Sequence, residues 1–143
     1  MPLIQVTAPQ DALKKNDQDA LVSQLSNAVL TAEKADINDP AAQALVGAYY
    51  SEQSNAGVYI GGENLNKAPL TIAITTPQGA LDAESRQSLV KDIGQIVDDL
   101  LGPFADRLNH WVQLYEVDEG SWAGAGQIFN LASIKEAMNI KAA

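Results

Sequence analysis

The sequence lacks cysteine altogether and contains a single histidine, His110. Without cysteine the chain can form no disulfide framework, no thiol nucleophile and no cysteine-ligated zinc site. A single histidine also excludes a multi-histidine metal site within one chain. We therefore expect neither a metal nor any other cofactor. His110 lies beside Trp111 in an alternating segment, and we interpret it as a packed or solvated strand residue.

Basic residues are scarce as well. Lys and Arg together number 9 against 18 Asp and Glu, which gives a formal charge of −9. Nucleic acids and anionic membranes are bound through clustered Lys and Arg, and the sequence has no such cluster. No apolar run approaches the roughly 20 residues that span a bilayer, and no signal-peptide pattern is visible. We expect a cytoplasmic protein without nucleic-acid or membrane partners.

What the chain does have is an internal repeat. Its 143 residues, 46% of them hydrophobic, suit one globular domain. A shift of 68 positions (72 − 4) aligns residues of the two halves: Ile4 with Ile72, Val6 with Ile74, Thr7 with Thr75, Pro9 with Pro77 and Gln10 with Gln78. We interpret residues 1–143 as a single domain built from two copies of one unit, about 1–68 and 69–143.

Each copy predicts the same order of strand, helix and strand. The predicted strands cover residues 3–7, 44–53, 70–76 and 110–117. The predicted helices repeat apolar residues every four positions and cover about 16–34 and 82–101. A glycine hairpin ends each copy, near 58–64 and 121–129. Two right-handed β-α-β units predict an α+β fold, a four-stranded mixed sheet with both helices on one face.

This arrangement leaves the second face of the sheet bare. The strands PLIQVT and PLTIAIT place apolar residues partly on both faces. Soluble monomers seldom expose a large apolar patch, so we expect a closed homo-oligomer that buries this face.

Pro2 is the one residue that predicts chemistry. Methionine before a small residue such as proline is normally removed, which would leave Pro2 with a free secondary amine. An α-amino group has a pKa of about 7.7–8.0, and an apolar pocket lowers it further. The neutral amine can act as a general base or as an iminium-forming nucleophile. Proline at position 2 is also common without any role, so Pro2 alone decides nothing.

Taken together, these features resemble the tautomerase superfamily of the 4-oxalocrotonate tautomerase and macrophage migration inhibitory factor type. Pro2 opens the segment PLIQV, and NAGVYIGG, IVDDL and HWV follow in the order of the fused branch, most similar to cis-3-chloroacrylic acid dehalogenase. The resemblance implies a homotrimer with the proline at the base of each pocket, close to a subunit interface. It also implies isomerisation of a small-molecule substrate, a keto or enol acid such as an aryl or alkyl enolpyruvate.

The resemblance is incomplete where substrate would bind. Val29 stands where the dehalogenase relatives have a histidine, and residues 75–80 contain neither of their two arginines. Gln113 falls at the position of their tyrosine, and Gly124 lies near that of their water-activating glutamate. With Pro2 as the catalytic residue, we expect substrate contacts from Lys34, Arg86, Gln113, Tyr115 and Trp122.

Two other functions stay open at this point. The chain could be a non-catalytic trimeric scaffold or binding protein of the same fold, above all if Met1 is retained. It could also be a hydratase, decarboxylase or dehalogenase of the same lineage. The missing arginine pair ranks that last function below tautomerisation.

Overall fold

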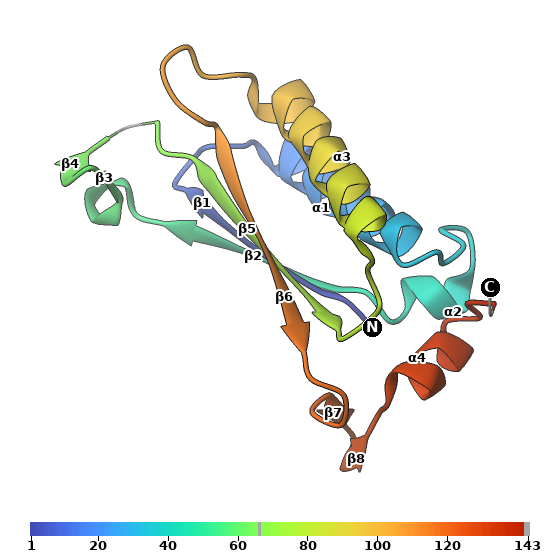
Figure 1. The fold of residues 1–143 in the computed structure, drawn as a ribbon. Helices are drawn as coiled ribbons and strands as arrows, with labels where there is room; N and C mark the ends of the chain where they lie inside the picture. Colours follow the sequence, from blue (N-terminus) through green and yellow to red (C-terminus); the bar gives the residue numbers. More distant parts are fainter. Residues whose placement is uncertain (66, 142–143) are drawn as a thin grey trace.

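A computed structural model describes residues 1–65 and 67–141 of the chain. It consists of a central sheet, two long helices, two shorter helices and two small hairpins (Figure 1). The elements in chain order are β1 (Leu3–Pro9), α1 (Lys15–Ala32), α2 (Pro40–Gln43), β2 (Gly47–Gln53), the 3-10 turn Asn55–Gly57, β3 (Tyr59–Ile60), β4 (Glu63–Asn64), β5 (Leu70–Pro77), α3 (Ala83–Leu101), β6 (His110–Val117), β7 (Ala123–Gly124), β8 (Gln127–Ile128) and α4 (Leu131–Ala137).

The central sheet has the strand order β2-β1-β5-β6. β1 runs parallel to β2 and β5 runs parallel to β6, whereas β1 and β5 are antiparallel. The helices α1 and α3 lie side by side on one face of this sheet (Figure 1). The α+β fold with a four-stranded mixed sheet and two helices on one face is therefore confirmed.

The central pair of strands has a symmetric register. Gln5 lies opposite Ala73, which is its counterpart 68 positions further along the chain (73 − 5), and Leu3 lies opposite Thr75. This is the register in which two copies related by a twofold rotation meet. It also places the beginning of β1 beside the end of β5.

One hydrophobic core lies between the sheet and the two long helices. The buried stripes of α1 and α3 are those that the four-residue spacing predicts, and they pack against the inward residues of the strands: Leu21, Leu25, Val29, Leu89, Ile93 and Val97 against Ile4, Val6, Leu70, Ile72 and Ile74. Asp82 begins α3 with a capping box. Its side chain accepts a hydrogen bond from the Ser85 amide, and the Ser85 hydroxyl accepts one from the Asp82 amide. Gly102, with φ of 84°, ends this helix.

Two short helices were not predicted from the sequence. Residues Pro40–Gln43 form α2, so β2 begins at Gly47 rather than at residue 44. After the second hairpin, Leu131–Ala137 form α4, whose first turn is capped by the Asn130 side chain. Helices this short are stabilised by packing rather than by helix propensity, and their apolar pattern is too short to predict them. No helix of the described residues is long and apolar enough to cross a membrane.

The face of the sheet that the helices leave uncovered carries aromatic and uncharged polar side chains. It is less apolar than the sequence suggested, because threonine, serine and glutamine alternate with the aromatic residues. Tyr49, Trp111 and Tyr115 are exposed by 67%, 54% and 49%. None of the residues along this face is charged: Leu3, Gln5, Thr7, Tyr49, Ser51, Thr71, Ala73, Thr75, Trp111, Gln113 and Tyr115.

Candidate active site

Pro2 is buried directly before β1. Its carbonyl oxygen accepts a hydrogen bond from the Gly47 amide at 3.1 Å, which fixes Pro2 beside the start of β2. Leu3 lies opposite Thr75, and Tyr115 continues this row on β6. The N-terminus therefore lies at the end of the sheet where β5 and β6 finish, on the side of the molecule that α2 and α4 occupy (Figure 1).

The Met1 amine lies in a mostly buried position next to Pro2. It donates a hydrogen bond to the Met138 sulfur at 2.9 Å and lies 3.9 Å from Glu33 Oε2. Burial lowers the pKa of this amine, and the charge of Glu33 partly opposes the shift. An amine in this environment is biased toward its neutral form, which is the form that can accept a proton.

Glu33 faces this amine, and sequence reasoning missed it. The residue is only 4% exposed, and neither of its carboxylate oxygens has a hydrogen-bond partner. Burial raises the pKa of Glu33, while the positive charges of the N-terminus and of Lys135 pull it down. A buried carboxyl group without a hydrogen-bond partner is held toward its neutral, protonated form.

A signal for Glu33 was present in the sequence. The buried stripe of α1 runs through Leu21, Leu25 and Val29, and the next position in this four-residue series is 33. Glu33 is also the C-cap of α1, where the helix dipole places negative partial charge. A carboxylate that continues a buried stripe and ends a helix is unfavourable on both counts, and such a residue deserves a functional explanation.

The surroundings of Met1 are apolar and come from four separate segments. Leu30 of α1, Ala42 of α2, and Ile134 and Met138 at α4 are buried together. The partly buried side chains that pack against them include Met1, Leu45, Val46, Trp122, Phe129 and Ile140. We call this cluster, with Glu33 at its edge, the N-terminal cup. A cavity of about 10 Å³ lies between Glu33, Pro77 and α4, which is room for about one water molecule.

Of the predicted substrate-binding residues, the structure brings Trp122 to this cup. Lys34 follows Glu33 directly, with φ of 65°, and pairs with Asp82 at 3.6 Å. Arg86 pairs more closely, with 2.6 Å between its guanidinium and Glu116. Both cations thus have a carboxylate partner within the chain.

Gln113 and Tyr115 do not meet the cup within one chain. Both lie on the uncovered face of the sheet, where Tyr115 is exposed by 49%. Tyr115 is in the same row as Leu3 and so lies at the same end of the sheet as Pro2. The contact of either residue with a substrate stays a prediction.

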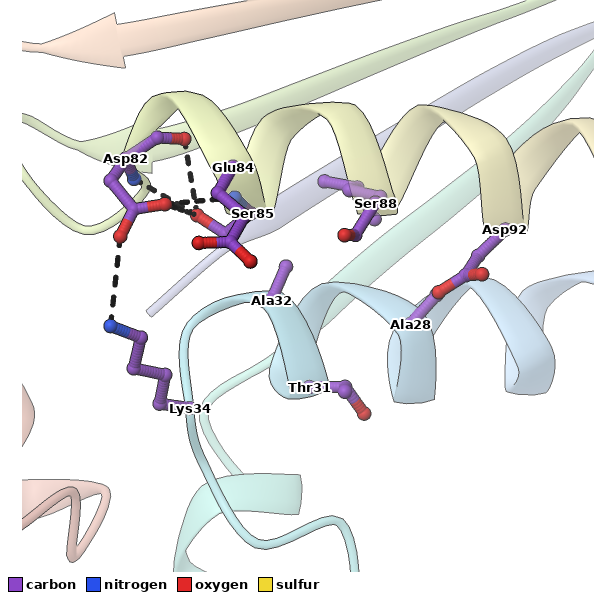
Figure 2. Close-up of a pocket in the computed structure, with 10 residues that line it drawn as sticks. Ala28, Thr31, Ala32, Lys34, Asp82, Glu84, Ser85, Ser88 and Asp92 are labelled. Carbon is purple, nitrogen blue, oxygen red and sulfur yellow. Dashed lines mark hydrogen bonds and ion pairs between the residues drawn. The ribbon is translucent and has the colours of Figure 1, made fainter.

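A separate groove of about 300 Å³ lies between α1 and α3. Figure 2 shows Lys34 reaching from the end of α1 to Asp82, and Ser88 and Asp92 continuing along α3. Its lining is acidic and small: Ala28, Thr31, Ala32, Lys34, Asp82, Glu84, Ser85, Ser88, Leu89 and Asp92. The one amine among these residues is paired with Asp82. The N-terminal cup, which unites an amine, a carboxyl group and apolar walls, is therefore the better candidate for an active site.

His110 is half-buried on β6. Its Nδ1 lies 2.6 Å from Asn109 Oδ1, and burial lowers its pKa. Within residues 1–65 and 67–141, no group of three or more His, Cys, Asp or Glu side chains is placed to hold a metal ion.

Comparison with known proteins identifies the fold. No family model and no curated protein matches the sequence. Among solved structures, the wild-type Q0 fused 4-OT symmetric trimer matches at 21% identity and TM-score 0.72, over 92% of this chain and 98% of that one. Pt0534 inactivated by 2-oxo-3-pentynoate matches at 18% identity and TM-score 0.71, over 87% of this chain and 93% of that one. N1, a member of the cis-3-chloroacrylic acid dehalogenase family, matches at 14% identity and TM-score 0.73, over 94% of this chain and 87% of that one.

These matches cover nearly the whole chain at low sequence identity. The chain therefore has the fold of the tautomerase superfamily.

Proposed function

We propose that the chain is a tautomerase-type isomerase in which Pro2, freed by removal of Met1, is the general base. The substrate is a small keto or enol acid such as an aryl or alkyl enolpyruvate. The observation that carries this proposal is the position of the N-terminus: Pro2 is buried and fixed by Gly47, beside the apolar cup in which burial lowers the pKa of the Met1 amine.

The reaction needs only a proton acceptor of suitable basicity and a place for the substrate. The neutral Pro2 amine takes a proton from one end of the O–C–C unit and returns it to the other end. Trp122 and the other walls of the cup contact the apolar part of the substrate and exclude water. Exclusion of water also keeps the amine in its neutral form between turnovers.

A covalent probe tests whether Pro2 is a reactive amine. We expect 2-oxo-3-pentynoate, which inactivates Pt0534, to add once to the mature protein, and peptide mass spectrometry to place the adduct on Pro2. A chain that retains Met1 has an amide nitrogen at Pro2 and is the matched control, in which Pro2 stays unlabelled. Labelling of lysine side chains alone, or an intact mass that includes Met1 in the native protein, would contradict the proposal.

A non-catalytic scaffold is the second candidate, and one observation favours it. The Met1 side chain is only 20% exposed, and its amine is hydrogen-bonded to Met138. The chain thus accommodates Met1 as a packed residue. Native protein that retains Met1 and isomerises no keto–enol substrate would decide for this function.

We further propose that the protein is a homotrimer that buries the uncovered sheet face. The absence of charge along that face and the exposure of Trp111 and Tyr115 support this assembly. The Q0 fused 4-OT of the same fold is a symmetric trimer.

Trp111→Glu tests the assembly. A carboxylate would have to be buried in the interface, so we expect light scattering to show particles of 15.2 kDa where the unaltered protein shows three times that mass. Gln87→Glu adds the same charge on the exposed side of α3 and is expected to leave the trimer intact. A Trp111→Glu protein that stays trimeric would show that this face is not the interface.

A further inference from the structure

The Met1 backbone indicates what the mature cup can hold. The Met1 nitrogen lies 3.9 Å from Glu33 Oε2, and the Met1 Cα and carbonyl carbon connect it to the nitrogen of Pro2. Bond lengths and the extended conformation before proline put the two nitrogens roughly 3.5 Å apart. The reacting O–C–C unit of a keto–enol pair is also three bonded atoms long. Removal of Met1 therefore leaves a slot of the right length, with the Pro2 amine at one end and Glu33 at the other.

We propose that Glu33 is the acid partner of the Pro2 amine: its carboxyl group gives a proton to the substrate oxygen while Pro2 takes one from the adjacent carbon. This inference rests on the proposed function of Pro2. It assigns a role to a carboxyl group that is 4% exposed, lacks hydrogen-bond partners and faces the terminal amine. Lys34 and Arg86, the two cations among the predicted substrate-binding residues, already have carboxylate partners.

The charged groups that face Glu33 are the terminal amine and Lys135 of α4. Both favour the ionised carboxylate, but burial has the larger effect and raises the pKa of Glu33. When Met1 is removed, the amine moves to Pro2 and lies further from Glu33, so its opposing effect weakens. The cup therefore combines a carboxyl group whose pKa is raised with a place where burial lowers the pKa of an amine, which is the combination that acid–base catalysis requires.

The proposed step balances in both directions. In enolisation, the Pro2 nitrogen accepts the proton of the α-carbon, and the C–H electron pair becomes the C=C bond. The carbonyl π pair moves to the oxygen, which takes the Glu33 proton and becomes the enol hydroxyl. Pro2 is then an ammonium and Glu33 a carboxylate. Ketonisation is the reverse and starts from the Pro2 ammonium and the Glu33 carboxylate. After enolisation and release of the enol, exchange with solvent returns a proton to Glu33 and removes one from Pro2, which restores the starting pair.

Glu33→Gln in the mature protein tests this role in the enolisation of phenylpyruvate, followed as the exchange of its α-carbon hydrogens for deuterium. The amide keeps the size of the side chain and can donate a hydrogen bond, but it cannot transfer a proton. We expect kcat to fall about 10²–10⁴-fold, with KM within about threefold of the unaltered value. The pH profile of kcat/KM is expected to lose one of its two limbs. Glu136→Gln, an exposed glutamate on the same helix as Lys135, is the matched control and keeps both kcat and the profile.

Infrared spectroscopy gives a second measurement that does not depend on turnover. We expect a protonated-carboxyl C=O band that persists at pH values above the ordinary glutamate pKa of 4.5, and that Glu33→Gln removes and Glu136→Gln retains. A Glu33→Gln protein with unaltered kcat and pH profile would overturn the role of Glu33 while leaving that of Pro2 intact, as would the absence of this band. If the unaltered mature protein isomerises no keto–enol substrate, the proposed function itself fails.

Discussion

A chain that retains Met1 is expected to isomerise phenylenolpyruvate no faster than the uncatalysed rate, and removal of Met1 is expected to restore full activity. With Met1 in place, the Pro2 nitrogen is part of a peptide bond and can neither accept a proton nor form an iminium ion. Met1 also fills the slot between Pro2 and Glu33. Loss of the general base alone accounts for a decrease of about 10²–10⁴-fold.

The measurement follows one preparation of unprocessed protein during digestion with methionine aminopeptidase. Intact mass gives the fraction that has lost Met1, and ultraviolet absorbance gives the rate of enol loss. The two are expected to rise in proportion. Pro2→Ala is a useful comparison, because its mature form keeps a primary amine and should lose activity only in part. Equal rates before and after digestion would contradict any role for the Pro2 amine.

Much of the fold was predictable because local signals and the global architecture agree. The four-residue stripes of α1 and α3 are buried as predicted, and β6 covers the predicted residues, His110–Val117. The capping box at Asp82 and the left-handed Gly102 fix the two ends of α3. Each of these features depends on residues close together in the chain, so the sequence carries them explicitly.

The elements that escaped prediction depend on contacts between distant residues. α4 has only seven residues and is held by Ile134 and Met138, which pack against Leu30 and Ala42. A helix of this length has little stability of its own. Because α4 was not predicted, nothing in the sequence indicated that the end of α1 is covered.

The same reasoning explains why the candidate site was only partly predictable. Pro2 follows from its place in the sequence, whereas the burial of Glu33 depends on segments about 100 residues further along the chain (134 − 33 = 101). The ion pairs of Lys34 and Arg86 are also contacts between distant residues, with Asp82 and Glu116. The sequence shows that a cationic side chain is present, but only the fold shows whether that side chain is already paired with a carboxylate.

Glu33→Leu is expected to stabilise the protein while it abolishes the proposed acid function. Glu33 is a buried carboxyl group without hydrogen-bond partners, and such a group costs about 1–3 kcal/mol. Leucine of similar volume would pack against the apolar cup instead. We expect the free energy of unfolding to rise by that amount, which corresponds to an increase in Tm of about 3–9 °C. Glu136→Leu on the exposed side of α4 is the control, and its effect is expected to lie within about 0.5 kcal/mol.

The stabilisation by Glu33→Leu should depend on pH, because the folded chain binds the Glu33 proton more tightly than the unfolded chain does. Its ordinary pKa is 4.5, and burial raises the pKa in the folded state. Below pH 4.5 the Glu33 carboxyl group is protonated in both states, and its burial then lowers the free energy of unfolding least. As pH rises from 4.5 through the raised pKa, ionisation favours the unfolded chain and the cost grows. Thermal melts at pH 4 and pH 8 should therefore show a larger stabilisation by leucine at pH 8. A loss of stability at pH 8 would mean that the Glu33 carboxylate has a stabilising partner in the mature protein, which is incompatible with a proton donor held for the substrate.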